Sequence, residues 1–226
     1  MNNMKLTYFL TAGLLTVTAI TIQAQDKKAT PSGIHFGVRA GVSLQNINGR
    51  DANDNKLQNK LVPRFQGGVN VELPLAAEFF IQPGVMFAAK GTEFKGSNTN
   101  LSLSYIEVPV NFLFKPVVGT GKLLLGVGPY IGFGIAGKAE PENGSSSSVT
   151  FKNSITVAEA ISGAPFYRKI DAGANLLFGY EMINNLSVQL NAQLGLAKIN
   201  PDIEGLSNNK TMYRNTGFGL SIGYRF

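Results

Sequence analysis

The chain contains one histidine, His35, which is the first candidate for a general base in a hydrolytic reaction. Such a base needs a serine or another nucleophile within hydrogen-bond reach. Ser43 lies further along the same predicted strand, about 26 Å away at the rise of an extended chain. Ser221 is expected on a neighbouring strand, facing the polar interior. This spacing favours a plain polar role for His35, and we predict no catalytic residue.

Carboxylates are the next candidates, as protease acids or as metal ligands. Four of them lie in predicted loops: Asp51, Asp54, Asp202 and Glu204. The stretch Asp51–Asn55 offers oxygen ligands but lacks the full spacing and the terminal glutamate of an EF-hand loop. The glycines of Gly126–Gly134 alternate along a strand, unlike a nucleotide-binding loop. We therefore predict no metal, no cofactor and no enzymatic activity.

Composition excludes several classes of protein. The 226 residues are 15% charged, against about 25% in soluble domains. An aromatic content of 10% argues against disorder, and the lack of cysteine excludes a disulfide scaffold. After residue 24, no stretch reaches the roughly 18 apolar residues of a membrane helix. The net charge of +6 is scattered along the chain, so we predict no nucleic-acid partner.

Residues 1–24 are predicted to be a secretory signal peptide. Lys5 supplies the positive region, Leu6–Ile22 is apolar, and Ala24 is a small residue at the cleavage position. Ile22 departs from the small residue expected three positions before cleavage. The alternative is an uncleaved membrane anchor, although the polar residues after Ala24 do not resemble a stop-transfer segment. The prediction divides the remainder into a periplasmic segment, 25–33, and a barrel domain, 34–226.

The rest of the chain repeats a period-two alternation of apolar and polar residues, which is typical of β-strands. Eight segments show it: His35–Leu44, Arg64–Leu73, Phe79–Lys90, Leu101–Phe114, Lys122–Lys138, Arg168–Tyr180, Leu186–Ala197 and Thr211–Phe226. Long polar connections alternate with short ones, which is the plan of an outer-membrane barrel. The short connections are Pro74–Glu78, Lys115–Gly121 and Glu181–Asn185. The long connections are Gln45–Lys60, Gly91–Asn100, Ala139–Phe166 and Asn200–Lys210. Ala139–Phe166 is the longest and the best candidate for binding a partner.

The chemistry of the two faces favours a membrane. One face of each segment is almost wholly aliphatic or aromatic, and eight strands enclose too narrow a space to hold eight such faces. The apolar faces must therefore point outward, which is tolerable only in lipid. We predict an all-β, eight-stranded antiparallel up-and-down transmembrane barrel. A soluble, periplasmic lipid-binding barrel, with the apolar faces turned inward, is the structural alternative.

Two sets of residues follow from this prediction. An aromatic girdle is expected at the short-turn rim: Phe36, Phe79, Phe112, Phe114, Phe178, Tyr180, Tyr224 and Phe226. Charged residues are expected in the lumen, paired across it because an unpaired buried charge is costly: Arg39, Arg64, Glu72, Glu107, Asp171 and Arg225. A paired lumen is a plug, not a wide pore.

The fourth segment shows an irregularity. Leu101, Leu103 and Tyr105 share their parity with Glu107, so apolar and polar residues change places near Ser104. A β-bulge, or a strand top that projects beyond the membrane, would account for it.

The chain resembles the small outer-membrane β-barrels of bacteroidetes, the PorT-like or outer membrane protein β-barrel domain family. The matching stretches are Phe36–Gly41, Phe80–Gly84, Tyr105–Val110, Gly126–Gly132 and Gly223–Phe226. The last stretch is similar to the signal read by the outer-membrane assembly machinery, so the resemblance implies contacts of Tyr224 and Phe226 with it. PorT itself is associated with secretion.

Together these features predict a non-enzymatic, monomeric outer-membrane protein with a narrow, largely plugged lumen and four extracellular loops. Its role would be structural or partner docking, with outer-membrane lipid and the assembly machinery as partners; the partner of the loops is not identified. A narrow porin-like channel and a lipid-modifying enzyme are the alternatives.

Overall fold

The computed structural model describes residues 33–206 and 210–226. The predicted signal peptide, residues 1–24, lies outside the described residues, as does the following segment up to residue 32. Among the described residues, none belongs to a helix that is both long enough and apolar enough to traverse a bilayer.

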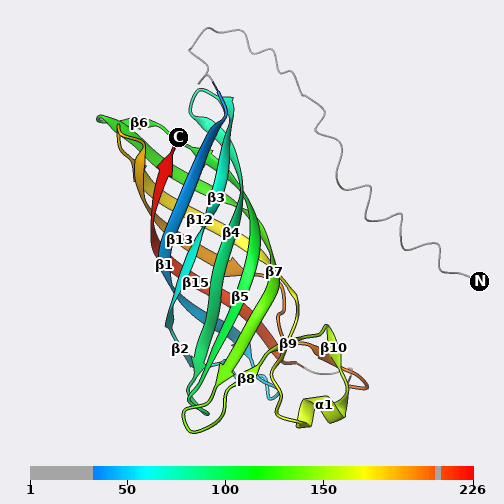
Figure 1. The fold of residues 1–226 in the computed structure, drawn as a ribbon. Helices are drawn as coiled ribbons and strands as arrows, with labels where there is room; N and C mark the ends of the chain where they lie inside the picture. Colours follow the sequence, from blue (N-terminus) through cyan, green and yellow to red (C-terminus); the bar gives the residue numbers. More distant parts are fainter. Residues whose placement is uncertain (1–32, 207–209) are drawn as a thin grey trace, which may run out of the picture.

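Eight long strands form one closed antiparallel barrel (Figure 1). They are β1 (His35–Arg50), β3 (Val62–Ala76), β4 (Phe79–Phe94), β5 (Thr99–Phe114), β7 (Gly121–Glu140), β12 (Ile170–Glu181), β13 (Leu186–Gly195) and β15 (Met212–Arg225). Each strand pairs with the next, and pairing of β1 with β15 closes the sheet. The eight segments predicted from alternation are confirmed, and most of the strands are longer than the segments.

The remaining elements are short. Near the carboxyl terminus lies β6 (Val117–Val118), and the opposite end of the barrel, which we call the loop end, carries the others (Figure 1). These are β2 (Asn59–Lys60), β8 (Ser147–Ser148), β9 (Thr150–Phe151), β10 (Ser154–Ile155), α1 (Val157–Ile161), β11 (Phe166–Tyr167) and β14 (Asp202–Ile203). Two parallel pairs, β9 with β11 and β10 with β14, order the segments that connect β7 to β12 and β13 to β15.

Two of the predicted long loops are shorter than expected. The prediction placed loops at Gln45–Lys60 and Gly91–Asn100, but β1 continues to Arg50, and β4 and β5 meet in a four-residue turn, residues 95–98. Polar residues at the strand ends led to the error, because they continue the ladder outside the apolar band.

The apolar faces point outward, as predicted. Val38, Leu125, Leu190 and Leu220 are 41%, 36%, 56% and 52% exposed. Side chains of opposite parity, such as Gln189 and Ser221, are buried inside the barrel. An inward-facing apolar cavity of the kind found in soluble lipid-binding barrels is therefore excluded.

The faces invert toward the loop end. Leu101, Leu103 and Tyr105 of β5 are buried at 1%, 0% and 0% exposure, on the same inner face as Glu107. Their neighbours Ser102 and Ser104 lie on the outer face. The alternation of β5 itself does not slip, and the strand top has a water-soluble pattern. A register shift at Ser104/Tyr105 leaves the extra residue on β7, so a bulge in β5 does not account for the change and the projecting strand top does.

Close strand approach requires glycine at Gly91. Its φ is +138°, and an added β-carbon would lie 1.9 Å from the carbonyl oxygen of Leu101 on β5. Gly91→Ala is expected to lower the free energy of unfolding by about 1–3 kcal/mol, because the strained backbone and the contact force β4 and β5 apart. The urea midpoint at which the heat-resistant folded band disappears on gels measures this. Gly96→Ala, in open space in the turn, is the matched control and should leave the midpoint unchanged.

Candidate functional site

The interior of the barrel holds most of the candidate site residues. Of the six predicted lumen charges, Glu72, Glu107 and Asp171 are buried, and Arg39, Arg64 and Arg225 are half-buried. All six sit on inward-facing strand positions. Four of them, Glu72, Glu107, Asp171 and Arg225, form ion pairs with Lys90, Lys115 or Glu181, and none of the ion pairs among the described residues joins two of the six.

The Lys115 network lies toward the end of the barrel that holds the carboxyl terminus. Lys115 Nζ is 2.7 Å from Glu72 Oε2 and 2.9 Å from Glu181 Oε2. Arg225 binds both carboxylate oxygens of Glu181, with its Nε at 3.0 Å from Oε2. Gln82 donates to Glu72 at 3.2 Å. Two cations and two carboxylates therefore balance in this layer.

The Lys90 network lies closer to the loop end. Lys90 Nζ is fully buried, 2.5 Å from Glu107 Oε1 and 2.8 Å from Asp171 Oδ2. It also lies 4.3 Å from the centre of the Tyr130 ring, a cation–π distance. Asn215 donates to Asp171 Oδ2 at 2.9 Å. One ammonium thus serves two carboxylates, and such charge-assisted contacts are the strong ones in a low-dielectric interior.

The two remaining arginines bind neutral groups. Arg39 donates to Asn191 Oδ1 at 3.2 Å. Its positive charge also interacts with Glu107, which is the second carboxylate of the Lys90 network. Arg64 donates to Asn100 at 2.6 Å and to the carbonyl of Leu101 at 2.9 Å. The two layers, with Arg39 included, hold four cations and four carboxylates.

Lys115 and Glu181 were missed from the sequence because they were assigned to short turns, and Lys90 was not counted although it lies on the polar face. The signal was present in the alternation. Lys115 follows Asn111 and Leu113 with inward parity, and Glu181 continues the parity of Asp171. Extending each alternating segment by one or two residues would have found both partners.

Apolar side chains also occupy the interior. One set, which we call the lower cluster, lies nearer than the Lys90 network to the end of the barrel that holds the carboxyl terminus: Phe80, Leu113, Leu124 and Leu177. At the loop end, a second set of residues, which we call the cap cluster, consists of Ile47, Leu101, Leu103, Tyr105, Tyr167 and Ile199. Two cavities beside the charged networks measure about 20 and 30 Å³, which is the space of one water molecule each.

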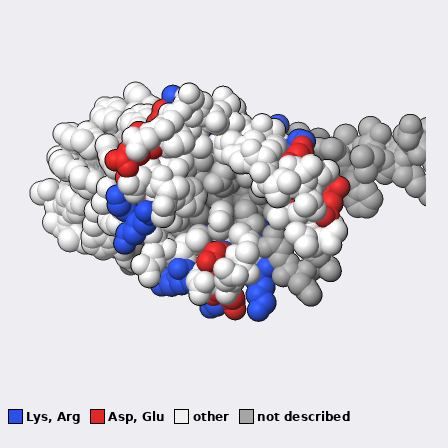
Figure 2. Space-filling view, turned by 90° about the horizontal axis from the view of Figure 1, so that it is seen from below, with Lys and Arg blue, Asp and Glu red and all other residues white. Residues whose placement is uncertain are grey.

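The segments that connect β7 to β12 and β13 to β15 contribute Tyr167 and Ile199 to the cap cluster. Tyr167 of β11 is 7% exposed, and burial raises the pKa of its phenol. Thr156 and Glu159 form a capping box at the start of α1, with hydrogen bonds of 3.0 and 3.2 Å. A hydrogen bond from Lys152 holds the pKa of Glu159 below its usual value. The long connection between β7 and β12 is therefore folded, and acidic and basic side chains are interspersed on this end (Figure 2).

The predicted aromatic girdle occupies outward positions at the end of the barrel that carries the carboxyl terminus. Phe36, Phe79, Phe112, Phe178, Tyr224 and Phe226 are more than a third exposed, and Phe114 and Tyr180 are half-buried. Phe79 stacks on Phe114 with ring centres 4.8 Å apart, and Tyr224 meets Phe226 edge to face at 5.1 Å. Tyr180 also donates its hydroxyl to the carbonyl of Val118.

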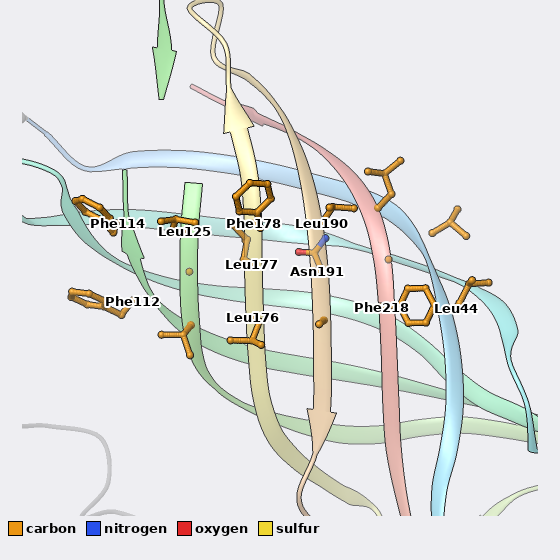
Figure 3. A pocket seen from close by; sticks show the side chains of 16 residues that line it. Leu44, Phe112, Phe114, Leu125, Leu176, Leu177, Phe178, Leu190, Asn191 and Phe218 are labelled. Carbon is orange, nitrogen blue, oxygen red and sulfur yellow. The ribbon is translucent and has the colours of Figure 1, made fainter. Parts of the chain in front are cut away.

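The outer wall next to this girdle carries an apolar groove of about 980 Å³ that crosses six strands (Figure 3). Phe112, Leu125, Phe178, Leu190 and Phe218 line it, and the small residues Ala192 and Gly219 leave space between them. A wall of this chemistry suits acyl chains and offers no group for catalysis.

The catalytic candidates do not converge. His35 is half-buried at the start of β1, whereas Ser221 pairs in register with Gly41, about 20 Å further along that strand. Ser221 is fully buried and accepts a hydrogen bond from Asn191 at 2.7 Å. Ser43 is likewise buried and bonded to Gln45.

The loop acids are bound locally. Asp51 Oδ1 accepts the backbone N–H groups of Asn53 and Asn55, both at 2.9 Å, and these bonds help to hold the pKa of Asp51 below its usual value. Asp202 pairs with Arg168 and Lys198, and Ser154 donates to Glu204. Across residues 33–206 and 210–226, no three His, Cys, Asp or Glu side chains gather as metal ligands.

Several solved structures of outer-membrane proteins are similar to this chain. A search of curated proteins finds no match. Among solved structures, Ail of Yersinia pestis, in complex with a heparin analogue, is 13% identical with a TM-score of 0.41, over 85% of this chain and 99% of that one. Neisserial surface protein A is 11% identical with a TM-score of 0.46, over 86% and 99%. A major outer membrane protein of Thermus thermophilus is 15% identical with a TM-score of 0.44, over 86% and 100%.

The family comparison is decisive. The model of the outer membrane protein β-barrel domain matches residues 23–200, which is more than three quarters of the chain. This match agrees with the closed eight-stranded barrel and its apolar outer wall. The chain therefore belongs to the outer membrane protein β-barrel domain family, and its place is the outer membrane.

Proposed function

We propose that this barrel is a non-enzymatic, monomeric structural or docking protein whose lumen is closed. The observation that carries the proposal is the sequence of layers inside it. The Lys115 network, the lower cluster, the Lys90 network and the cap cluster all occupy the interior, and this supports a closed lumen. Separating the buried ion pairs to admit solutes would leave uncompensated charges, which is strongly unfavourable.

Conductance tests the closed lumen. The purified protein in planar lipid bilayers is expected to show no discrete conductance steps. Arg39→Ala is expected to show none either, because the Lys90 and Lys115 networks and both apolar clusters remain. Discrete steps in the wild type that grow larger in Arg39→Ala would establish the channel alternative instead. Hydrolysis of phospholipid or lipid A that His35→Ala abolishes would establish the enzyme alternative.

We further propose that the loop end faces the outside of the cell and carries the docking surface. The folded connection between β7 and β12 supports this role, because it presents exposed apolar side chains on a fixed frame: Ile161 is 81% exposed and Val157 52%. Exposed apolar patches on a soluble surface commonly mark contact sites. A PorT-like contribution to secretion is one form that this docking role would take.

Orientation is testable because the chain contains no cysteine. Ser145→Cys places one thiol in the connection between β7 and β12, and Thr120→Cys places one in the short turn at the other end. A membrane-impermeant maleimide added to intact cells is expected to label only the first variant. Labelling of the second variant alone would show that the orientation is opposite to the proposed one.

At the opposite end, we propose that Tyr224 and Phe226 contact the outer-membrane assembly machinery during insertion. Their exposure, 42% and 67%, supports this role in addition to their place in the girdle.

A further inference from the structure

A polar patch lies on the outer wall of β1 and β15, where the apolar face ends. The register of the two strands forms a short ladder of opposed pairs. Leu44 faces Phe218, then Asn46 faces Thr216, and then Asn48 faces Arg214. The pair Arg50 and Met212 follows. The side chains therefore change from apolar to polar within one step along the outer face.

Arg214 points outward. Its neighbours Tyr213 and Asn215 face the interior, where Tyr213 packs against the cap cluster and Asn215 donates to Asp171. Alternation then places Arg214 on the outer wall. Phe218 and Leu220, on the same face, are 53% and 52% exposed. Arg214 thus lies just beyond the acyl-chain region of the wall, at the height of lipid headgroups.

One donor of the Arg214 side chain is unsatisfied among the described residues. Its Nε is buried, and no group in the described parts of the chain accepts a hydrogen bond from it. Two other basic residues on the outer face form ion pairs with carboxylates. Lys138 lies 2.6 Å from Glu140, and Lys60 lies 2.5 Å from Glu93. Arg214 is only half-buried as a whole, so a phosphate that binds its accessible part would place negative charge beside the unsatisfied donor, and an unsatisfied buried donor is costly.

We propose that Arg214, with Arg50 and the amide of Asn48, binds a phosphate group of an outer-leaflet lipid. A guanidinium matches phosphate oxygens in a two-point hydrogen-bonded geometry. Arg50 is 3.0 Å from Asp54, but this pair is solvent-exposed and leaves the guanidinium accessible. With Asp54 counted, the patch keeps a net positive charge. The assignment to the outer leaflet rests on the orientation proposed above.

The experiment uses the full mature chain folded in a phosphate-free detergent. Binding of diphosphoryl lipid A, of its dephosphorylated form and of inorganic phosphate is measured by native mass spectrometry. Arg214→Gln is expected to weaken binding of diphosphoryl lipid A about tenfold or more, since it removes a charge-assisted hydrogen bond. Lys138→Gln is the matched control, because it removes an outward base that already has a carboxylate partner. This control is expected to change binding less than twofold.

Several results would overturn the proposal. They are equal weakening by the two variants, equal binding of the dephosphorylated lipid, and binding of inorganic phosphate as strong as that of the lipid. Heat-resistant gel mobility of each variant separates lost binding from lost folding. The maleimide experiment tests orientation independently, so a failure of the phosphate site and a failure of the orientation give different results.

Discussion

Replacing Lys90 with methionine is expected to lower the free energy of unfolding by about 3–5 kcal/mol, the usual cost of breaking a buried ion pair. The substitution leaves the carboxylates of Glu107 and Asp171 facing each other without their shared ammonium. Folded and unfolded fractions, read from heat-resistant gel mobility across a urea series, measure the change.

Two further variants make this test specific. Lys60→Met removes a base whose ion pair with Glu93 is exposed, and it is expected to change the free energy by less than about 1 kcal/mol. The double variant with Asp171→Asn added to Lys90→Met should recover part of the loss, because the charge of Arg39 still balances the remaining carboxylate of Glu107. If Lys90→Met costs no more than Lys60→Met, the Lys90 network does not stabilise the barrel.

Leu103→Ala is expected to loosen the cap cluster while the membrane part of the barrel stays folded. Leu103 is fully buried, and truncating a buried leucine costs about 2–5 kcal/mol. The connection above it, which contains Lys152 and packs on the cluster through Val149 and Phe151, should become sensitive to trypsin. Mass spectrometry of the fragments should then show cleavage after Lys152.

Leu190→Ala is the matched control for this prediction. Leu190 faces the membrane, 56% exposed, and its truncation exchanges contacts with lipid instead of opening a cavity. Cleavage after Lys152 should proceed at the wild-type rate. Equal cleavage of the two variants would mean that Leu103 does not hold the connecting segments in place.

Much of the barrel follows from the period-two alternation alone. Because one strand face meets lipid, an outward residue such as Leu125 must be apolar, and its parity assigns the inward face of the same strand. That rule predicted the eight strands and the inward positions of Glu72 and Asp171. The same rule also predicts that Lys115 and Glu181 face inward, once each strand is extended to the end that the structure shows.

The loop end was harder to predict, for a physical reason. Leu101 and Leu103 lie on the polar parity of β5, and the partners that bury them, Tyr167 and Ile199, are distant in the sequence. Tyr167 lies in a two-residue strand and Ile199 lies in no helix or strand, so neither belongs to a segment long enough to show a period. Only the inversion of faces near Ser104 signalled that the strand continues into water.

The cap cluster also constrains the order of folding. Ile47 and Ile199 meet in it although 199 − 47 = 152 residues separate them along the chain. Contacts of such long range form late, because the entropy of closing a large loop is lost before the contacts can stabilise the structure. The loop end is therefore expected to mature last, after the wall of the barrel has closed.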